Sequence, residues 1–243
     1  MNFSTKKAFL FLGFGILMSF MMISCLEGDK ERLKHANALY QQSQENKDYI
    51  TSLVALNEIV LLDTQVGAYH DSLARIYLAQ GNYDAALKFG QKVLKQQPDY
   101  QKMIELVGLS HEALGNMEEA IQKFASLFLR TGQLKYQYEI GKIELGRQNY
   151  VAADSVLNFI TNDTSGDKST VDMQSASGKV SKIATTAAAN YLQGVLLVER
   201  EQKFKLGAKK MRAALAIEPN FELAIQYLQE LERYQQMMAY PRR

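Results

Sequence analysis

Two matching stretches decide the fold of this chain: GNYDAALKF at residues 81–89 and GNMEEAIQK at residues 115–123. Each opens with a Gly-Asn pair and places an alanine five positions after the glycine, at Ala86 and Ala120. Their separation of 34 residues is the period of helix-turn-helix repeats. Glycine tolerates the left-handed backbone that ends a helix, and a small residue lets two helices approach closely. The two stretches therefore predict paired amphipathic helices.

The same spacing extends the pattern in both directions. A step of 34 residues backward from Ala86 reaches Ser52, and a near-identical step of 33 residues forward from Ala120 reaches Ala153. A further copy near the end of the chain contains Phe204, Gly207 and Pro219. A single helical hairpin cannot bury its apolar face alone, so neighbouring hairpins must stack.

These residues resemble the tetratricopeptide repeat. Leu73-Ala74-x-x-Tyr77 is similar to the Leu-Gly-x-x-Tyr signature of that family, and Ala86 and Pro98 match its later positions. The resemblance implies an all-α, right-handed superhelical solenoid of about five repeats plus a C-terminal capping helix. The repeats are expected at about 33–66, 67–100, 101–134, 134–160 and 187–220, and the capping helix at 221–238.

Residues 161–182 interrupt the pattern. They are rich in Ser, Thr, Asp and Gly and have no helical stripe. Connections of this length are functional or disordered. The composition favours a disordered insertion over a binding loop.

The N-terminus has the order of a secretory signal. Lys6 and Lys7 precede an apolar run at 8–23, which is followed by Ser24 and Cys25. Residues 22–25, Met-Ile-Ser-Cys, resemble a bacterial lipobox, although Met22 replaces the preferred leucine. The resemblance implies a cleaved signal peptide at 1–24, lipid attachment at Cys25 with palmitate-type acyl chains, a tether at 25–32, and the solenoid at 33–243. An uncleaved membrane helix is the alternative.

The tether also bears on location. Leu26 is not aspartate, so the inner-membrane retention signal of enteric lipoproteins is absent at that position. We therefore expect a protein of the bacterial cell envelope, lipid-anchored in the outer membrane and facing the periplasm. Glu27 and Asp29 form a short acidic patch, which accompanies surface export in some lineages and supports a surface-exposed protein as the alternative.

Composition excludes several classes of partner and site. Lys6 and Lys7 are the only charged residues before Cys25, so the 28 basic and 26 acidic residues of the chain become 26 of each after cleavage. A neutral chain has no bulk attraction to nucleic acid. One cysteine forms neither an intramolecular disulfide nor a cysteine zinc site. His70 and His111 are expected to pack within helix pairs. We predict no metal, no cofactor and, because no catalytic motif is present, no enzymatic activity.

Proteins or extended peptides are the partners that the resemblance implies. Family members bind them in a concave groove lined by the first helix of each repeat. Carried over to this sequence, the groove positions are Asp71, Arg75, Leu78, Lys102, Glu105, Leu109, Glu112, Lys135, Tyr138, Lys142 and Tyr191. Both signs of charge alternate with apolar groups, which suits an extended peptide or a partner helix. The family's clamp for a terminal carboxylate needs lysine and asparagine where Asp71, Arg75, Glu105 and Leu109 stand here, so that mode is not expected. Convex faces and loops are alternative sites.

The sequence therefore predicts a membrane-anchored scaffold or adaptor for an envelope assembly, secretion or cell-wall machine. The alternative is a surface-exposed lipoprotein that binds a nutrient or a host ligand.

Overall fold

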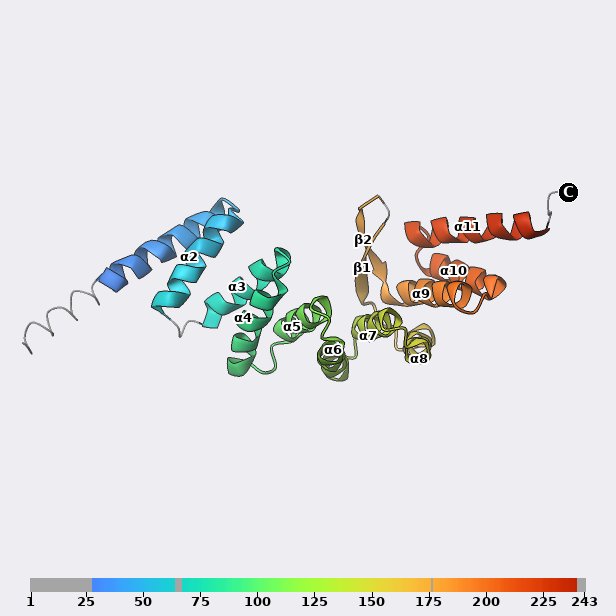
Figure 1. Ribbon diagram of the computed structural model, residues 1–243, viewed down its shortest axis with the longest axis horizontal. Coiled ribbons are helices and arrows are strands. Elements are labelled where there is room, and N and C mark those ends of the chain that lie inside the picture. Colours follow the sequence, from blue (N-terminus) through green and yellow to red (C-terminus); the bar gives the residue numbers. More distant parts are fainter. Residues whose placement is uncertain (1–27, 64–66, 176, 240–243) are drawn as a thin grey trace, which may run out of the picture. The chain divides into compact units, whose positions relative to one another are not determined.

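The computed structural model describes residues 28–63, 67–175 and 177–239, and nearly all of its elements are helices (Figure 1). The first helix covers residues 28–45. The later helices are α2 (Tyr49–Leu62), α3 (Gly67–Ala79), α4 (Tyr83–Gln96), α5 (Gln101–Ala113), α6 (Met117–Thr131), α7 (Leu134–Gly146), α8 (Tyr150–Thr161), α9 (Thr185–Glu199), α10 (Phe204–Ile217) and α11 (Glu222–Ala239).

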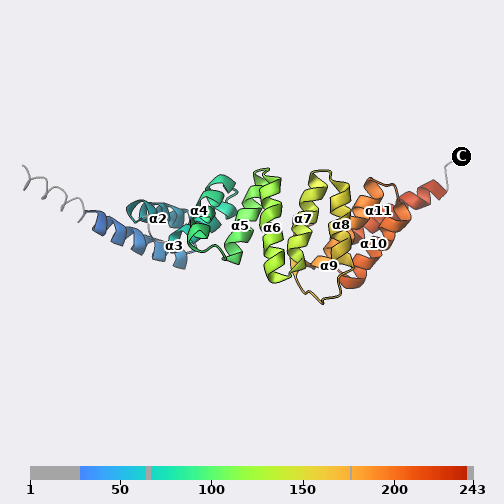
Figure 2. The ribbon, with the colours of Figure 1, turned by 90° about the horizontal axis from the view of Figure 1, so that it is seen from below.

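Consecutive helices pack in pairs. Helix α3 packs on α4, α7 on α8, and α9 on α10, and Figure 2 shows α7 and α8 side by side. Two helices fall, to within a few residues, in each range in which the sequence predicts a repeat, and α11 covers the range of the predicted capping helix. We use the term first helices for residues 28–45, α3, α5, α7, α9 and α11, and the term second helices for α2, α4, α6, α8 and α10.

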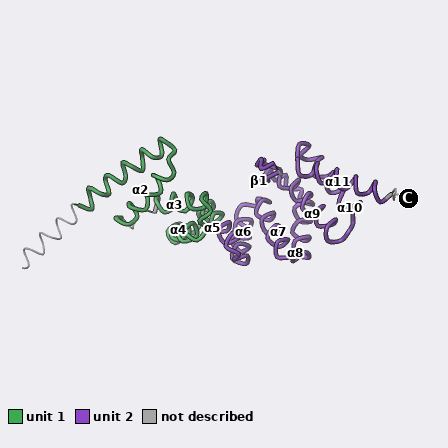
Figure 3. Tube along the Cα trace, turned by 45° about the horizontal axis from the view of Figure 1, so that its top comes forward, with its two compact units in different colours: residues 1–106 green, residues 107–243 purple. Residues whose placement is uncertain are grey.

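The chain divides into two compact units (Figure 3). Unit 1 ends at Leu106 and unit 2 begins at Val107, so the boundary lies within α5. Each unit has its own set of buried apolar side chains.

In unit 1, small residues lie where the helices of a pair cross. Ser52 and Ala86 are fully buried, and the hydroxyl groups of Ser43 and Ser52 are 2.7 Å apart between the first two helices. Gly81 has φ +73°, the left-handed conformation that ends α3, and Asn82 then caps α4 by accepting a hydrogen bond from the Ala85 amide. The Gly-Asn pair of the sequence thus forms the turn of this helix pair.

Unit 2 has a larger core that includes α7–α11 and the strands. Its members include Leu134, Leu157, Ile183, Met211 and Phe221. The backbones of α9 and α10 approach each other closely at Gly207 and Gly194. A Cβ added at Gly207 would lie 2.2 Å from Val198 Cγ2 and 3.0 Å from the Gly194 carbonyl oxygen, so only glycine fits this crossing.

The prediction of a disordered insertion at 161–182 is wrong. Strands β1 (Thr170–Gln174) and β2 (Val180–Ala184) form an antiparallel hairpin, with Val171 paired to Ile183. Val171 and Ile183 are 5% and 4% exposed and belong to the unit 2 core. The polar composition concealed a short period-two pattern, in which apolar residues on one face alternate with polar residues on the other.

No helix in residues 28–63, 67–175 and 177–239 is long and apolar enough to cross a membrane. The predicted signal peptide and Cys25 lie outside the described residues.

Candidate functional site

The predicted site residues on α3 form a closed polar cluster in unit 1. Arg75 Nε donates to Asp71 Oδ1 at 2.7 Å, and Arg75 Nη2 donates to the Tyr100 hydroxyl oxygen at 2.8 Å. Tyr100 in turn donates to Asp71 Oδ2 at 3.2 Å. Burial works against the charge of Arg75, but Asp71 and Tyr100 outweigh it and raise the pKa of Arg75. The Arg75 guanidinium, the Asp71 carboxylate and the Tyr100 hydroxyl group are therefore bonded to one another.

The remaining predicted residues of unit 1 lie on α3 and α5. Leu78 is half-buried at the end of α3, Lys102 is exposed, and Glu105 is half-buried on α5.

Unit 1 also contains a tyrosine pair that was not predicted from the sequence. Tyr40 and Tyr69 meet edge to face, and the Tyr69 hydroxyl donates to Asn37 Oδ1 at 2.5 Å. Tyr40 lies in the range of the first predicted repeat, 33–66, and Tyr69 lies in that of the second, 67–100.

In unit 2, Lys142 lies between two carboxylates. Its Nζ is 2.5 Å from Glu139 Oε2 and 3.1 Å from Glu112 Oε1, so it joins α7 to α5. Burial lowers the pKa of Lys142, but the two carboxylates together raise it above its usual value. Leu109 is half-buried on α5, and Lys135 Nζ lies over the Tyr136 ring at 4.6 Å.

Tyr138 does not line an open groove, contrary to the prediction. It is 4% exposed, and its hydroxyl group is 3.8 Å from Met173 Sδ of the hairpin. Burial is the main reason that the pKa of Tyr138 is raised. The inserted hairpin covers this position, which repeat spacing alone could not reveal.

Tyr191 belongs to an aromatic and acidic surface formed by α9 and α11. Its ring centroid is 5.2 Å from that of Phe221 and 6.2 Å from that of Tyr227. The Tyr227 hydroxyl donates to Glu199 Oε1 at 3.2 Å. Tyr227, Glu199 and Glu230 were not among the residues predicted from the sequence. The sequence could have indicated these residues if α11 had been treated as one more first helix, because groove positions could then have been assigned along it by the repeat spacing.

His70 in unit 1 and His111 in unit 2 take part in packing. His70 is 3% exposed and stacks on Phe89, and His111 is buried with its Nδ1 3.4 Å from Asn116 Nδ2. Burial lowers the pKa of both imidazoles and so favours their neutral forms. Among the described residues, no three His, Cys, Asp or Glu side chains gather as a metal site.

Comparison with known proteins identifies the fold. No protein-family model and no curated protein matches the chain. A tetratricopeptide repeat protein from Parabacteroides merdae superposes with a TM-score of 0.59 at 14% identity, over 83% of this chain and 72% of that one. The C-terminal part of a repeat protein from Cytophaga hutchinsonii gives 0.60 at 15% identity, over 84% and 71%. YrrB, described as a repeat protein with an unusual peptide-binding site, gives 0.55 at 15% identity, over 81% and 89%.

At these identities, the similarity concerns the fold alone. They confirm the prediction of an α-helical fold of the tetratricopeptide-repeat type, built from adjacent helix pairs.

Proposed function

We propose that this chain is a membrane-anchored scaffold whose first helices bind segments of other proteins. The fold supports a binding role because stacked helix pairs present extended surfaces to peptides and partner helices. The peptide-binding site described for YrrB is in keeping with this use of the fold. The proposal includes no catalytic step.

The observation that carries the proposal is the surface of α9 and α11. Tyr191 and Tyr227 are half-buried there, and a cavity of about 960 Å³ opens beside Tyr227. Tyr227 and Tyr234 line this cavity, and aromatic side chains in such a place supply a large contact area at a low cost in side-chain entropy. A partner segment can therefore bury substantial area at this surface.

Site-specific photo-crosslinking in cells tests the binding role. A photoreactive phenylalanine derivative at Tyr227 should form adducts with one or a few defined proteins. The same residue at Leu129, which is 84% exposed on the second helix α6, is the matched control and should give no defined adduct. The absence of a reproducible adduct at Tyr227 would sink the proposal, and an equal adduct at Leu129 would move the site to the second helices.

We propose further that Cys25 carries the lipid anchor, in the outer membrane and facing the periplasm. The support comes from the order of Lys6-Lys7, the apolar run and Ser24-Cys25. Two or three acyl chains suffice for firm anchoring.

Fractionation tests the anchor. Wild-type chain should incorporate labelled palmitate and sediment with membranes, and Cys25→Ala should do neither. A Cys25→Ala chain that still sediments with membranes would show that the apolar run itself is the anchor.

Location is tested separately, with protease added to intact cells. The proposed orientation predicts that the chain is digested only after the outer membrane is opened. Digestion on intact cells would favour the surface-exposed binding protein instead.

A further inference from the structure

We propose that the cavity between α9 and α11 binds an arginine or lysine side chain of the partner polypeptide. This inference rests on the proposed function, since it specifies the chemistry of a segment bound at the first helices. It requires a cavity of sufficient size, an excess of negative charge that the described chain does not neutralise, and walls suited to an aliphatic stem.

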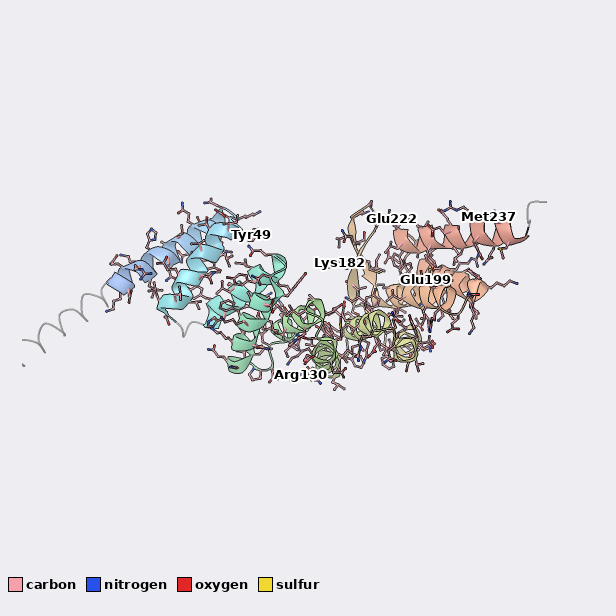
Figure 4. All side chains as sticks on the ribbon, in the orientation of Figure 1. Tyr49, Arg130, Lys182, Glu199, Glu222 and Met237 are labelled. Atoms are coloured by element: carbon pink, nitrogen blue, oxygen red, sulfur yellow. The ribbon has the colours of Figure 1, made fainter. Side chains whose placement is uncertain are left out.

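The cavity has the size and the walls that this side chain needs. Its volume is about 960 Å³, and its walls include Tyr227, Leu231, Tyr234 and Met237 of α11 and Glu199 of α9. Figure 4 labels Glu199 and Met237 on these two helices. Leu231 and Met237 supply apolar surface for a methylene stem, while the tyrosine rings and the carboxylates supply the polar end.

Two carboxylates of this cavity lack a cation within the described residues. Glu199 accepts a hydrogen bond from Tyr227, and neither Glu199 nor Glu230 forms an ion pair in that part of the chain. Burial raises the pKa of Tyr227, and the charges of Glu199 and Glu230 raise it further. Both carboxylates therefore act on the same phenol group.

Arg233 is the one cation among the described residues that line the cavity. Its Nε donates to the Gln229 carbonyl oxygen of its own helix at 3.4 Å, and it forms no ion pair within the described residues. One arginine against two glutamates leaves the wall with a net charge of −1. A cationic ligand is therefore favoured and an acidic one is disfavoured.

The guanidinium group fits these partners best. It can stack on a phenol ring and donate two parallel hydrogen bonds to a carboxylate. A lysine ammonium group has no planar face to stack on the phenol ring and cannot donate the two parallel hydrogen bonds to one carboxylate, so arginine should bind more tightly than lysine.

The cavity on the other side of α11 provides a contrast. It measures about 880 Å³ and is lined by Phe204, Lys203, Lys205 and Glu232, among others. Here Glu232 already accepts from Arg212 at 2.7 Å, and the two lysines contribute positive charge. The same selection for a cation does not apply there.

A peptide array tests the inference. The full chain, solubilised in mild detergent and fluorescently labelled, is incubated with a positional-scanning array of decapeptides. The variants are Glu199→Gln/Glu230→Gln and, as the matched control, Glu118→Gln/Glu119→Gln on the second helix α6. Both doubles remove two charges from exposed helical positions, so a loss that is specific to the first double reports the cavity.

We expect wild-type chain and the control double to select peptides with arginine, and less strongly lysine, at one position. Replacing that arginine by citrulline should weaken binding roughly tenfold in both. In Glu199→Gln/Glu230→Gln the same replacement should change binding less than about twofold. Selection of peptides without a preference for basic residues would overturn the inference and leave the proposed function standing. Selection of no peptide above background would overturn both.

Discussion

The first helices of the two units carry similar polar groups but use them differently. In unit 1, Asp71, Arg75 and Tyr100 satisfy one another within a closed cluster. In unit 2, Glu199 and Tyr227 border a cavity, and no described cation neutralises the carboxylate. A repeat position alone therefore does not make a binding site, because charges that are already paired offer less to a partner than charges that are not.

The two units also differ in their inserted structure. Among the described residues, strands occur only in unit 2, where the hairpin covers Tyr138. The hairpin thus removes one predicted binding residue from the surface, while Tyr191 and Tyr227 remain half-buried. An insertion can therefore shift the usable surface along the same series of helices.

The largest expected effect comes from the crossing of α9 and α10. Gly207→Val should destabilise the chain by about 3 kcal/mol or more, because the new side chain overlaps Val198 and approaches the Gly194 carbonyl. Urea unfolding followed by circular dichroism measures this loss. Gly146→Ala is the control, since a Cβ there meets no atom within 4 Å and should be neutral or slightly stabilising. Equal effects of the two substitutions would contradict the close approach.

The hairpin gives the next largest effect. Ile183→Ala should cost about 2–4 kcal/mol, because it removes a side chain that is packed into the unit 2 core. Val180→Ala on the same strand should cost less than about 0.5 kcal/mol, because Val180 is 60% exposed. The same unfolding measurement checks both. Two small and similar losses would mean that this segment is not packed on unit 2 in solution.

Acidification should weaken unit 1 by a smaller amount. Burial, and then the charge of Lys92, lower the pKa of His70 below its usual value. The unfolded chain therefore binds the proton more readily, so the contribution of His70 is fully present above about pH 6.5 and is lost as the pH falls through the lower folded pKa. We expect His70→Phe to remove on the order of 1 kcal/mol of this pH dependence.

Urea unfolding between about pH 7.5 and pH 5 measures that difference, because this range spans the usual pKa of histidine. His35→Gln, on the exposed face of the first helix, is the control. If His70→Phe keeps the full pH dependence of wild-type chain, the buried neutral imidazole is not its source.

The ion pair of unit 1 should give the smallest effect. Asp71 and Arg75 are one helical turn apart and partly exposed, so their coupling free energy should be about 0.3–0.5 kcal/mol. A double-mutant cycle of Asp71→Asn and Arg75→Gln measures it. The same double should leave peptide binding unchanged. A strong loss of peptide binding would break the contrast between the units, because it would make the closed cluster of unit 1 part of the site.

Local sequence signals determined the helix pairs. The Gly-Asn turns at 81 and 115, the small residues at Ser52, Ala86, Ala120 and Gly207, and the 34-residue spacing depend on contacts within one helix pair or between neighbours. Such contacts leave a periodic record in the sequence, so the paired helices and their approximate ranges could be predicted from the sequence.

Only the tertiary structure decided which groups share a surface. The hairpin at 170–184 and its cover over Tyr138 depend on a strand pattern too short to distinguish from a polar loop. The meeting of Tyr191, Glu199 and Tyr227 depends on how α11 packs beside α9, and the closure of Asp71, Arg75 and Tyr100 depends on side-chain conformations. The physical reason is that repeat spacing sets the path of the backbone, whereas side-chain pairing and cavities arise from packing between elements distant in sequence.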